Sequence, residues 1–449
     1  MKQFDAYLEA HQERFLAELE ALLRVPSVAA QSTGIAEAAT MVRDRLQQLG
    51  AEARLIEAGG GNPVVYGTIG SGPRRLLIYD HYDVQPAEPL GLWHSPAFEP
   101  TRRDGKLFAR GVADNKGNLM LRIQAIEAWL ATNGELPLSI AFVVEGEEEI
   151  GSRTLPAFCR EHPELLRADG CLWETGGRDI SERPEVSCGA KGIQYVEIVA
   201  RGASHDLHSS VAPLVPNPAW RLVWALSTLK GPDERVLIPG FYDGVRPPSA
   251  ADLAALESIP NNDEALLASY GLPQFLDGAR GVEALRRYLF EPTCTICGLV
   301  SGYTGAGSKT VLPNEARAKI DFRLVPDQDP ADLLRKLRAH LDAIGCADFE
   351  VIDLGGEHPA RSDLDAAIVR AAVSSARETY GLEPIVYPTM AGTGPIYPLC
   401  QALGTPSASG AGCGYHGNFV HAPNENIRLA DYMQAQRWMG RLIRNFAAA

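Results

Sequence analysis

The feature of this sequence that most constrains its fold is an apolar segment that ends in a cluster of acids. Residues 138–144 are almost entirely apolar, and four carboxylates follow within five positions: Glu145, Glu147, Glu148 and Glu149. Such an apolar run is typical of a strand buried on both faces of a sheet. Carboxylates this close repel one another unless cations or solvent compensate their charge. The segment therefore predicts either a metal site at a strand end or a solvated acidic loop.

Strand-like and helix-like segments alternate on both sides of this one. Further strands are expected at 53–56, 64–69 and 76–79, and helices at 1–23, 36–49 and 118–131. This alternation is typical of an α/β sheet covered by helices on both faces. Sites in such sheets collect at the carboxyl ends of the strands.

From Gly189 the pattern changes, which predicts an inserted α+β domain. Its expected strands are 194–201, 316–324 and 349–354, and its expected helices are 218–230 and 330–344. Between them lies a stretch rich in Pro, Asp and Ala that runs to Leu289 and favours no element. The chain then returns to the first domain with a helix at 363–380, a strand at 384–387 and a helix at 429–445.

Charge and composition narrow the class of protein. With 42 Lys and Arg against 56 Asp and Glu, the formal charge is −14, which argues against nucleic acid or an anionic membrane as a partner. The N-terminal segment is charged throughout, no apolar run approaches the ~20 residues of a membrane span, and eight cysteines are scattered. The pair Cys294-x-x-Cys297 has no second pair to complete a zinc site. A cytoplasmic protein is expected.

Two histidines and several acids follow strand-like segments or lie in turns. His81 and Asp83 are two residues apart, so in extended chain they point the same way and the carboxylate can fix the imidazole tautomer. Asp114 lies in a glycine-flanked turn before a helix, Glu174 ends a strand-like segment, and His421 lies in a turn. Each residue alone could be an ordinary loop residue or a helix cap. Together they suit zinc or manganese.

A ligand set of this kind can hold two ions through a bridging carboxylate and leave one Glu free as a general base. The sequence has neither the G-x-S-x-G elbow of serine hydrolases nor the Walker A sequence of nucleotide-binding proteins. Metal-assisted hydrolysis is therefore the expected chemistry.

Five short motifs occur in order along the chain: His81-Tyr82-Asp83, Trp93-His94-Ser95-Pro96, Asp114-Asn115-Lys116-Gly117, Glu148-Glu149-x-Gly151-Ser152 and His421-x-Pro423-Asn424-Glu425. Taken together, they resemble the M20 family of dinuclear metallopeptidases, which contains dipeptidases, carboxypeptidases and related deacylases. In the insert, Asp206-Leu207-His208-Ser209 and Lys309-Thr310-Val311-Leu312-Pro313 are similar to the lid domain of the dipeptidase branch. The resemblance spans nearly the whole chain.

The resemblance implies an α/β fold with two domains. A discontinuous catalytic domain, residues 1–188 and 360–449, would hold a mixed, mostly parallel sheet covered by helices on both faces. An inserted α+β lid or dimerisation domain would span residues 189–359. The implied assembly is a homodimer.

The resemblance also implies two divalent ions per subunit, Zn²⁺ first, with Mn²⁺ or Co²⁺ as alternatives. His81 and Glu174 would ligate one ion, and Glu149 and His421 the other. Asp114 would bridge both, with a cis peptide bond after it. His416 is a rival to His421, but it lacks the Pro-Asn-Glu that follows His421.

The implied catalytic residues are Glu148, Asp83 and His208. Glu148 would act as the general base toward a metal-bridging water, and Asp83 would orient His81. His208 would reach the active site of the neighbouring subunit and stabilise the oxyanion.

The implied substrate is a small peptide. Arg323 would bind its C-terminal carboxylate, since the guanidinium forms a planar fork of donors. The other candidates for substrate binding are Thr310, His358 and Gly394.

Two departures from the dipeptidase pattern leave the substrate open. Glu174 is more often Asp in dipeptidases and carboxypeptidases and Glu in deacylases. The segment Met390–Pro395 replaces an Arg-Asp/Glu-Gly loop that helps to hold the substrate carboxylate. A third departure, Asn115 in place of a common Asp, is expected to cost little. The hypotheses are a dipeptidase or short-peptide carboxypeptidase, an N-acyl-amino-acid deacylase, and a non-catalytic binding relative, against which the intact base argues.

Overall fold

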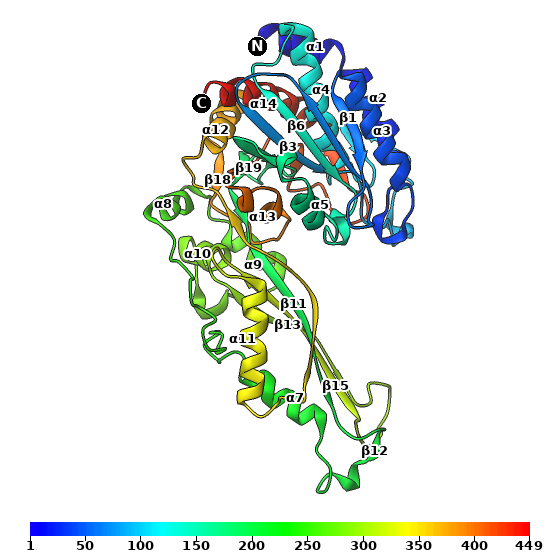
Figure 1. Cartoon of the computed structure of the whole chain (residues 1–449), viewed down its shortest axis with the longest axis vertical. Helices are drawn as coiled ribbons and strands as arrows, with labels where there is room; N and C mark the ends of the chain where they lie inside the picture. Colours follow the sequence, from blue (N-terminus) through cyan, green and yellow to red (C-terminus); the bar gives the residue numbers. More distant parts are fainter.

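The first lobe of the molecule is built around a six-stranded sheet, and the computed structural model describes all residues, 1–449 (Figure 1). The strand order is β1-β2-β6-β3-β7-β19, with bounds Glu52–Ile56, Val64–Ile69, Ser139–Glu145, Arg75–His81, Gly170–Trp173 and Ser407–Ser409. The four strands from β6 to β19 run parallel, whereas β1 and β2 pair in antiparallel fashion. The prediction of a mixed, mostly parallel sheet is confirmed.

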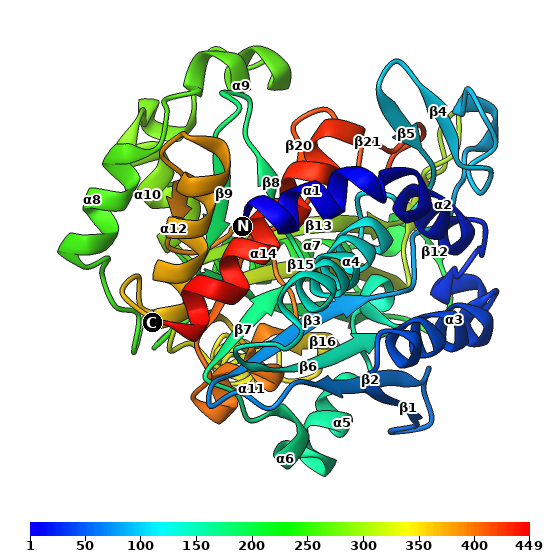
Figure 2. The same cartoon turned by 90° about the horizontal axis from the view of Figure 1, so that it is seen from above.

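Alternate side chains of the sheet face two different cores. Leu76 and Ile78 belong to the larger core, whereas Leu77 and Tyr79 on the same strand belong to a second one. The larger core packs against α1, α2, α3, α4, α12 and α14, which span Lys2–Ala10, Gln12–Leu23, Ile35–Gln48, Lys116–Asn133, Ala367–Tyr380 and Leu429–Ala447. The second packs against α5 (Leu155–Glu161), α6 (Pro163–Leu166) and α13 (Ile396–Leu399). Helices therefore cover both faces, as Figure 2 also shows.

The single N-terminal helix expected over residues 1–23 is wrong in one respect, because the chain forms two helices that meet at His11. The backbone of His11 leaves the helical region, with φ −111° and ψ 10°, and its ring stacks on Tyr7 with centroids 3.9 Å apart. Both helices still bury the apolar stripe predicted from the spacing, including Phe4, Leu8 and Phe15.

The second lobe holds an antiparallel sheet with the order β13-β15-β11-β16. Its strands span Thr293–Ser301, Glu315–Leu324, Gly192–Arg201 and Glu350–Glu357. Helices α7 (Pro218–Ser227) and α11 (Pro330–Ala343) pack on this sheet around a separate apolar core. The expectation of an inserted α+β unit agrees with this arrangement, and its boundaries at 189 and 359 stay predictions.

The stretch before Leu289, for which no element was expected, contains three helices: α8 (Ala250–Ser258), α9 (Asp263–Tyr270) and α10 (Val282–Phe290). Each buries only two of its residues. In α8 and α9 the apolar residues follow no helical period, whereas Val282, Leu285 and Leu289 of α10 do and were not recognised. One local signal was present, because Ser249 and Asp252 form a capping box at the start of α8.

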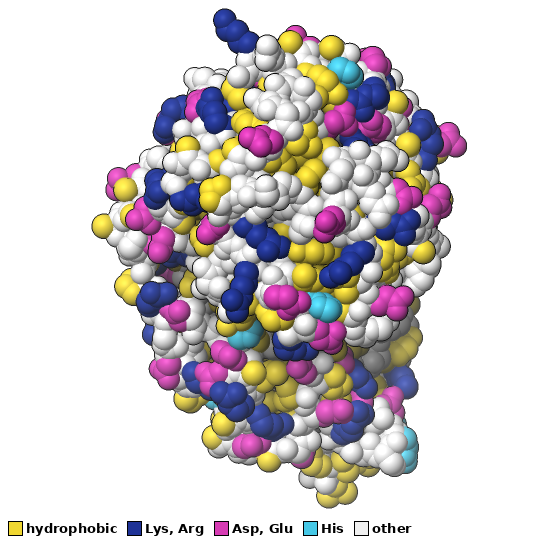
Figure 3. All heavy atoms as spheres, turned by 45° about the horizontal axis from the view of Figure 1, so that its top comes forward, with side chains coloured by type: hydrophobic (Ala, Val, Ile, Leu, Met, Phe, Trp, Pro, Cys, Tyr) yellow, Lys and Arg dark blue, Asp and Glu magenta, His cyan; other side chains and the backbone are white.

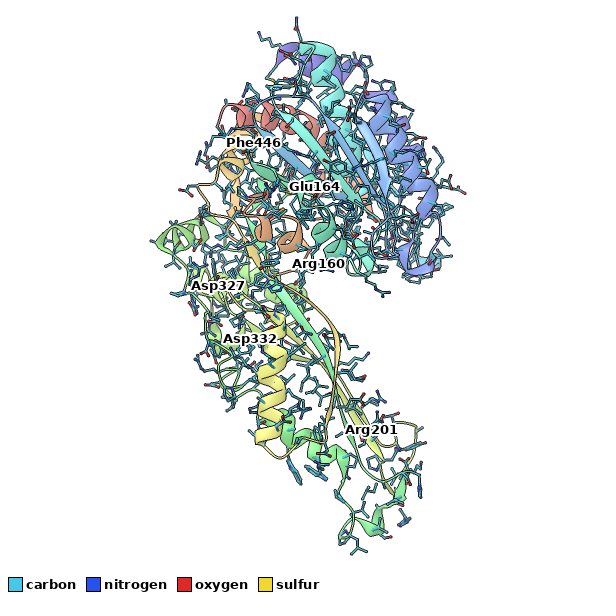
Figure 4. All side chains as sticks on the ribbon, in the orientation of Figure 1. Arg160, Glu164, Arg201, Asp327, Asp332 and Phe446 are labelled. Carbon is cyan, nitrogen blue, oxygen red and sulfur yellow. The ribbon has the colours of Figure 1, made fainter.

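Several short strands join the lobes and frame the site. β10 (Gly189–Ala190) pairs with β17 (Ala360–Arg361), so the two chain crossings between the lobes lie side by side. A small sheet has the order β18-β9-β8-β20, spanning Ile385–Tyr387, Pro184–Ser187, Gly177–Arg178 and Gly414–Tyr415. Another contains β21 (Asn426–Arg428), β5 (Lys106–Phe108) and β4 (Thr101–Arg103). β12 (Leu207–His208) pairs with β14 (Val311–Leu312) near the far end of the second lobe (Figure 1). Arg201, labelled in Figure 4, lies toward the same end.

The surface carries charges of both signs. On the face drawn in Figure 3, acidic and basic side chains are interspersed and neither dominates. No helix combines the length and the apolar character needed to span a membrane. The expected cytoplasmic location stays a prediction.

Candidate metal centre

The candidate site lies at one edge of the six-stranded sheet, where three parallel strands end. His81 is the last residue of β3, Glu145 is the last of β6, and Glu174 directly follows β7. The acids after β6 and the turn before α4 meet at this edge because the carboxyl ends of parallel strands lie together. His421 arrives from the loop before β21.

Asp114 lies at the centre of the predicted ligands. Its Oδ1 is 3.0 Å from Nε2 of His81, and its Oδ2 is 3.1 Å from Nε2 of His421. The same His81 nitrogen is 3.4 Å from Oε2 of Glu174, and the same His421 nitrogen is 3.1 Å from Oε2 of Glu149. The five side chains therefore form two groups that share Asp114.

The chemistry of this group fits divalent ions. Glu149 Oε1 and Glu174 Oε2 are buried and have no hydrogen-bond partner, which is costly for carboxylates unless a cation faces them. His81, Asp114 and Glu149 offer ligand atoms that all lie within 4.8 Å of one another. Imidazole nitrogens and carboxylate oxygens are the ligands that zinc takes in hydrolytic sites.

The electrostatics of the group are those of crowded acids. Burial raises the pKa of Glu174 well above its ordinary value, and the nearby Glu148 raises it further. Burial alone would also raise the pKa of Asp114, but hydrogen bonds with the imidazoles of His421 and His81 lower it below its usual range. The two imidazoles thus favour the charged carboxylate of Asp114 despite its burial.

Asp83 holds the backbone that carries Glu148 and Glu149. Its two carboxylate oxygens accept hydrogen bonds from the amides of Glu148 (3.3 Å) and Glu149 (3.1 Å). Nδ1 of His81 lies 3.0 Å from the Asp83 carbonyl oxygen, closer than the 3.4 Å to its carboxylate.

Burial raises the pKa of Glu148 to about 7. The nearby His81 opposes this rise, whereas the charges of Asp114 and Glu149 add to it.

Glu425 is a site residue to which the sequence analysis assigned no role. Its buried carboxylate accepts hydrogen bonds from the backbone amides of Gly111 (2.9 Å), Ala113 (2.8 Å) and Asp114 (3.1 Å). It also pairs with the buried Arg110 at 2.8 Å. Glu425 therefore positions the turn that carries Asp114. Its place at the end of the His421 motif was the only signal in the sequence.

Changing Glu425 to Gln should weaken metal binding without removing a ligand. The amide has one acceptor oxygen in place of two, so it cannot satisfy the three backbone amides, and the buried Arg110 loses its counter-ion. We expect about a 10–100-fold loss of Zn²⁺ affinity, the usual cost of losing a supporting contact of a ligand. Titration of the metal-free protein with Zn²⁺ measures it. Unchanged affinity in a folded variant would contradict the positioning role.

Arg122 and Asn115 hold the strand ends together through buried hydrogen bonds. The buried guanidinium of Arg122 donates to the Asp80 carboxylate at 2.7 Å and to the carbonyls of Trp173 (2.9 Å), Glu174 (2.8 Å) and the Gly410 residue (3.1 Å). The Asn115 side-chain amide also donates to Asp80, at 2.7 Å. An Asp at 115 would face that buried carboxylate instead, so Asn does more here than serve a turn. The peptide bond between Asp114 and Asn115 is cis, as the resemblance implies.

Three of the four predicted substrate-binding residues lie around one segment of the chain. Nη1 of Arg323 donates to Thr393 Oγ1 at 2.9 Å, and Nη2 pairs with Asp321 at 3.1 Å. The ring of His358 stacks on Tyr397 with centroids 4.3 Å apart. A Cβ on Gly394 would lie 3.1 Å from the Trp173 ring, which directly precedes Glu174. This segment thus lies between the base of the second lobe and the metal centre.

His208 and Thr310 lie elsewhere. His208 is the last residue of β12 and Thr310 directly precedes β14, with Nε2 of His208 3.4 Å from Oγ1 of Thr310, near the far end of the second lobe (Figure 1). Neither residue joins the metal centre of its own chain. His416, the rival to His421, packs edge-on against Tyr415 at 5.5 Å and makes no contact with the ligand group.

Comparison with known proteins agrees with this geometry. Residues 77–445 match the sequence model of the peptidase family M20/M25/M40. The chain is 26% identical over 457 residues to Beta-Ala-His dipeptidase of Mus musculus, covering 96% of this chain and 92% of that protein. It is 30% identical over 358 residues to the Cys-Gly metallodipeptidase dug1 of Schizosaccharomyces pombe, covering 75% and 74%.

Solved structures give the same answer for the fold. The M20 family metallo-carboxypeptidase Sso-CP2 from Sulfolobus solfataricus superposes with a TM-score of 0.92 at 38% identity, covering 97% of this chain and 99% of that one. Human carnosine dipeptidase 1 superposes with a TM-score of 0.80 at 25% identity, covering 100% and 99%. The two-lobed arrangement is thus shared along essentially the whole chain.

Proposed function

This chain belongs to the peptidase family M20/M25/M40 and is a metallopeptidase, and we propose that it hydrolyses the amide bond of dipeptides or short peptides that carry a free C-terminal carboxylate. One observation carries the proposal: Asp114 lies between two groups of nitrogen and oxygen ligands, with the half-buried Glu148 close enough to interact electrostatically with His81 and Asp114. The similar dipeptidases and the similar carboxypeptidase support this class of substrate.

We assign two divalent ions to this centre, Zn²⁺ first, with Mn²⁺ or Co²⁺ as alternatives. His81 and Glu174 would hold one ion, Glu149 and His421 the other, and Asp114 both. The two unpartnered carboxylate oxygens support this assignment, because each would gain a partner. Such ions, when bound, polarise a carbonyl oxygen and lower the pKa of water.

Glu148 is the proposed general base. Its raised pKa suits a group that accepts a proton from the attacking water and later returns it to the leaving amine near neutral pH. Its backbone amide is held by Asp83, so the side chain starts from a defined position. Asp83 also faces Nδ1 of His81 and thereby directs Nε2 toward Asp114.

The substrate carboxylate is proposed to bind at Arg323. The side chain is about one-third exposed, and its present partners, Asp321 and Thr393, leave donors of the guanidinium free. His358 and Gly394 flank the same segment and are proposed to contact the substrate there. An arginine at this place selects substrates with a planar anionic end.

His208 and Thr310 are proposed to act in the active site of a second subunit, which requires a homodimer. Their position far from the metal centre of their own chain supports this, as do exposed apolar side chains on the second lobe. Trp220 and Trp224 belong to α7, their rings stack on each other, and they are 58% and 61% exposed. Ile296 on the edge strand β13 is 50% exposed. Apolar groups so exposed on an edge strand and helix are suited to subunit contact.

An N-acyl-amino-acid deacylase is the second candidate. Glu174 in place of Asp favours it, as does the segment Met390–Pro395, which replaces the loop that helps to hold the substrate carboxylate in the dipeptidase pattern. Both candidate substrates end in a carboxylate, so Arg323 serves either. A non-catalytic relative is set aside, because the family and the similar proteins are peptidases.

A substrate panel tests the function. The zinc-loaded protein should hydrolyse dipeptides and short peptides, lose activity when a chelator removes the metal, and act at least about 100-fold more slowly on C-terminally amidated peptides, which lack the group that Arg323 binds. An Arg323→Lys variant keeps the positive charge but lacks the planar fork of donors. It should therefore reduce the ratio of the rate on free peptides to the rate on amidated peptides. Equal rates on free and amidated peptides would remove the carboxylate clamp. Hydrolysis of N-acyl amino acids alone would favour the deacylase.

A further inference from the structure

The Trp93-His94-Ser95-Pro96 motif supplies none of the proposed ligands, yet the loop that carries it is bonded to the loop of His421. We propose that residues 87–96, which we call the clamp, hold His421 in its ligating position, and that Asn424 and Trp93 are positioning residues for the ion assigned to Glu149 and His421. This inference rests on the two-ion assignment of the proposed function and adds to it the residues that support one ligand.

His421 is the most exposed of the five proposed ligands. Its side chain is 53% exposed, whereas those of the other four are 24% exposed or less. It lies in the loop 416–425, between β20 and β21, and its φ of 61° is a left-handed conformation that residues other than Gly adopt at a steric cost. Such a conformation persists only where the surrounding structure holds it. The loop therefore needs contacts from outside itself.

Asn424 makes the direct connection between this loop and the clamp. Its Oδ1 accepts a hydrogen bond from the backbone amide of His94 at 2.8 Å, and its Nδ2 donates to the carbonyl oxygen of Leu92 at 2.9 Å. The side-chain amide of Asn426 donates to the Asn424 carbonyl oxygen at 3.0 Å. Asn424 is thus fixed from both sides, three residues after His421.

A second connection runs from the clamp to Glu425 through Arg110. The indole N–H of Trp93 donates to the carbonyl oxygen of Ala87 at 2.7 Å, which closes the clamp on itself. The guanidinium carbon of Arg110 lies 5.3 Å from the centroid of the Trp93 ring, within the range of a cation–π contact, and the same guanidinium pairs with Glu425 at 2.8 Å. Because Glu425 directly follows Asn424, two neighbouring residues connect the loop to the clamp by separate routes.

A looser His421 should weaken one ion and spare the other. Nε2 of His421 is 3.1 Å from both Asp114 and Glu149, whereas His81 and Glu174 form the other ligand group. A general loss of stability would weaken both ions alike. The difference between the two affinities therefore separates a positioning role from a merely structural one.

Asn424→Gly tests the clamp, because it removes both side-chain hydrogen bonds while Gly still adopts the left-handed backbone freely. Titration of the metal-free full chain with Zn²⁺, in competition with a coloured chelator, should show one ion bound as in the wild type and the other about 10–100-fold more weakly. Asp104→Gly is the matched control. It makes the same kind of change at another left-handed position of the first lobe, with φ 51° and an exposed side chain, and should bind both ions as the wild type does.

Trp93→Phe is the second variant, and it decides the matter should Asn424→Gly not fold. It keeps an aromatic ring beside Arg110 but loses the hydrogen bond to Ala87, so we expect the same ion to be weakened. Wild-type affinity for both ions in the folded variants would overturn the clamp, and so would an equal loss of affinity for both.

The proposed function fails in a different way. A wild-type protein that binds two ions but hydrolyses no peptide would reject the peptidase proposal, and the comparison of affinities would still decide the role of the clamp. A wild-type protein that binds fewer than two ions would overturn the two-ion assignment and the clamp with it.

Discussion

Replacing Glu148 with Ala should lower kcat by about 10²–10⁴, the usual contribution of a positioned general base, while the metal content stays near that of the wild type. The reason is that the half-buried Glu148 lies beside the ligand group, but Asp114 and its two histidines are in contact without it. Steady-state kinetics on a dipeptide, with metal content measured on the same preparation, checks both parts.

Glu164→Ala is the matched control, because this glutamate lies in the same lobe with its side chain 66% exposed. It should change neither rate nor metal content. Turnover retained in Glu148→Ala would reject the base role. Loss of metal along with activity would show instead that Glu148 is needed to hold the ions.

Hybrid dimers should recover activity that both parent variants lack. If His208 acts in the neighbouring site, a His208→Ala dimer and a Glu148→Ala dimer are each inactive. A mixed dimer contains one site with an intact Glu148 and an intact His208 from the partner. Random mixing after reversible dissociation makes half of the dimers mixed, each with one complete site, so about a quarter of wild-type activity is expected if the sites are independent.

The measurement is the rate of dipeptide hydrolysis before and after mixing, with the oligomeric state followed by light scattering. Mixing Glu148→Ala with Asp114→Ala is the control. Each chain supplies both residues to its own metal centre, so a mixed dimer has one site without Glu148 and one without Asp114, and neither site is complete. No recovery in confirmed mixed dimers would place the role of His208 elsewhere.

Much of the first lobe could be predicted because its signals are local. The apolar run of β6 and the acids that follow it are adjacent in sequence, and the parallel-sheet rule then brings His81, Glu149 and Glu174 to one edge. Helices α8 and α9 escaped prediction because each buries only two side chains and their apolar residues follow no helical period, whereas α10 carries an apolar stripe that the sequence analysis did not recognise.

The sequence alone determined the kinds of groups in the site, because metal ligands, a base and glycine-flanked turns are encoded by residue type and short spacing. Only the tertiary structure decided what holds them. Arg122 bonds partners between 42 and 288 residues away, and Glu425 binds amides more than 300 residues earlier. Such contacts follow from how buried polar groups must be paired once the strands are packed, and no local pattern records that pairing.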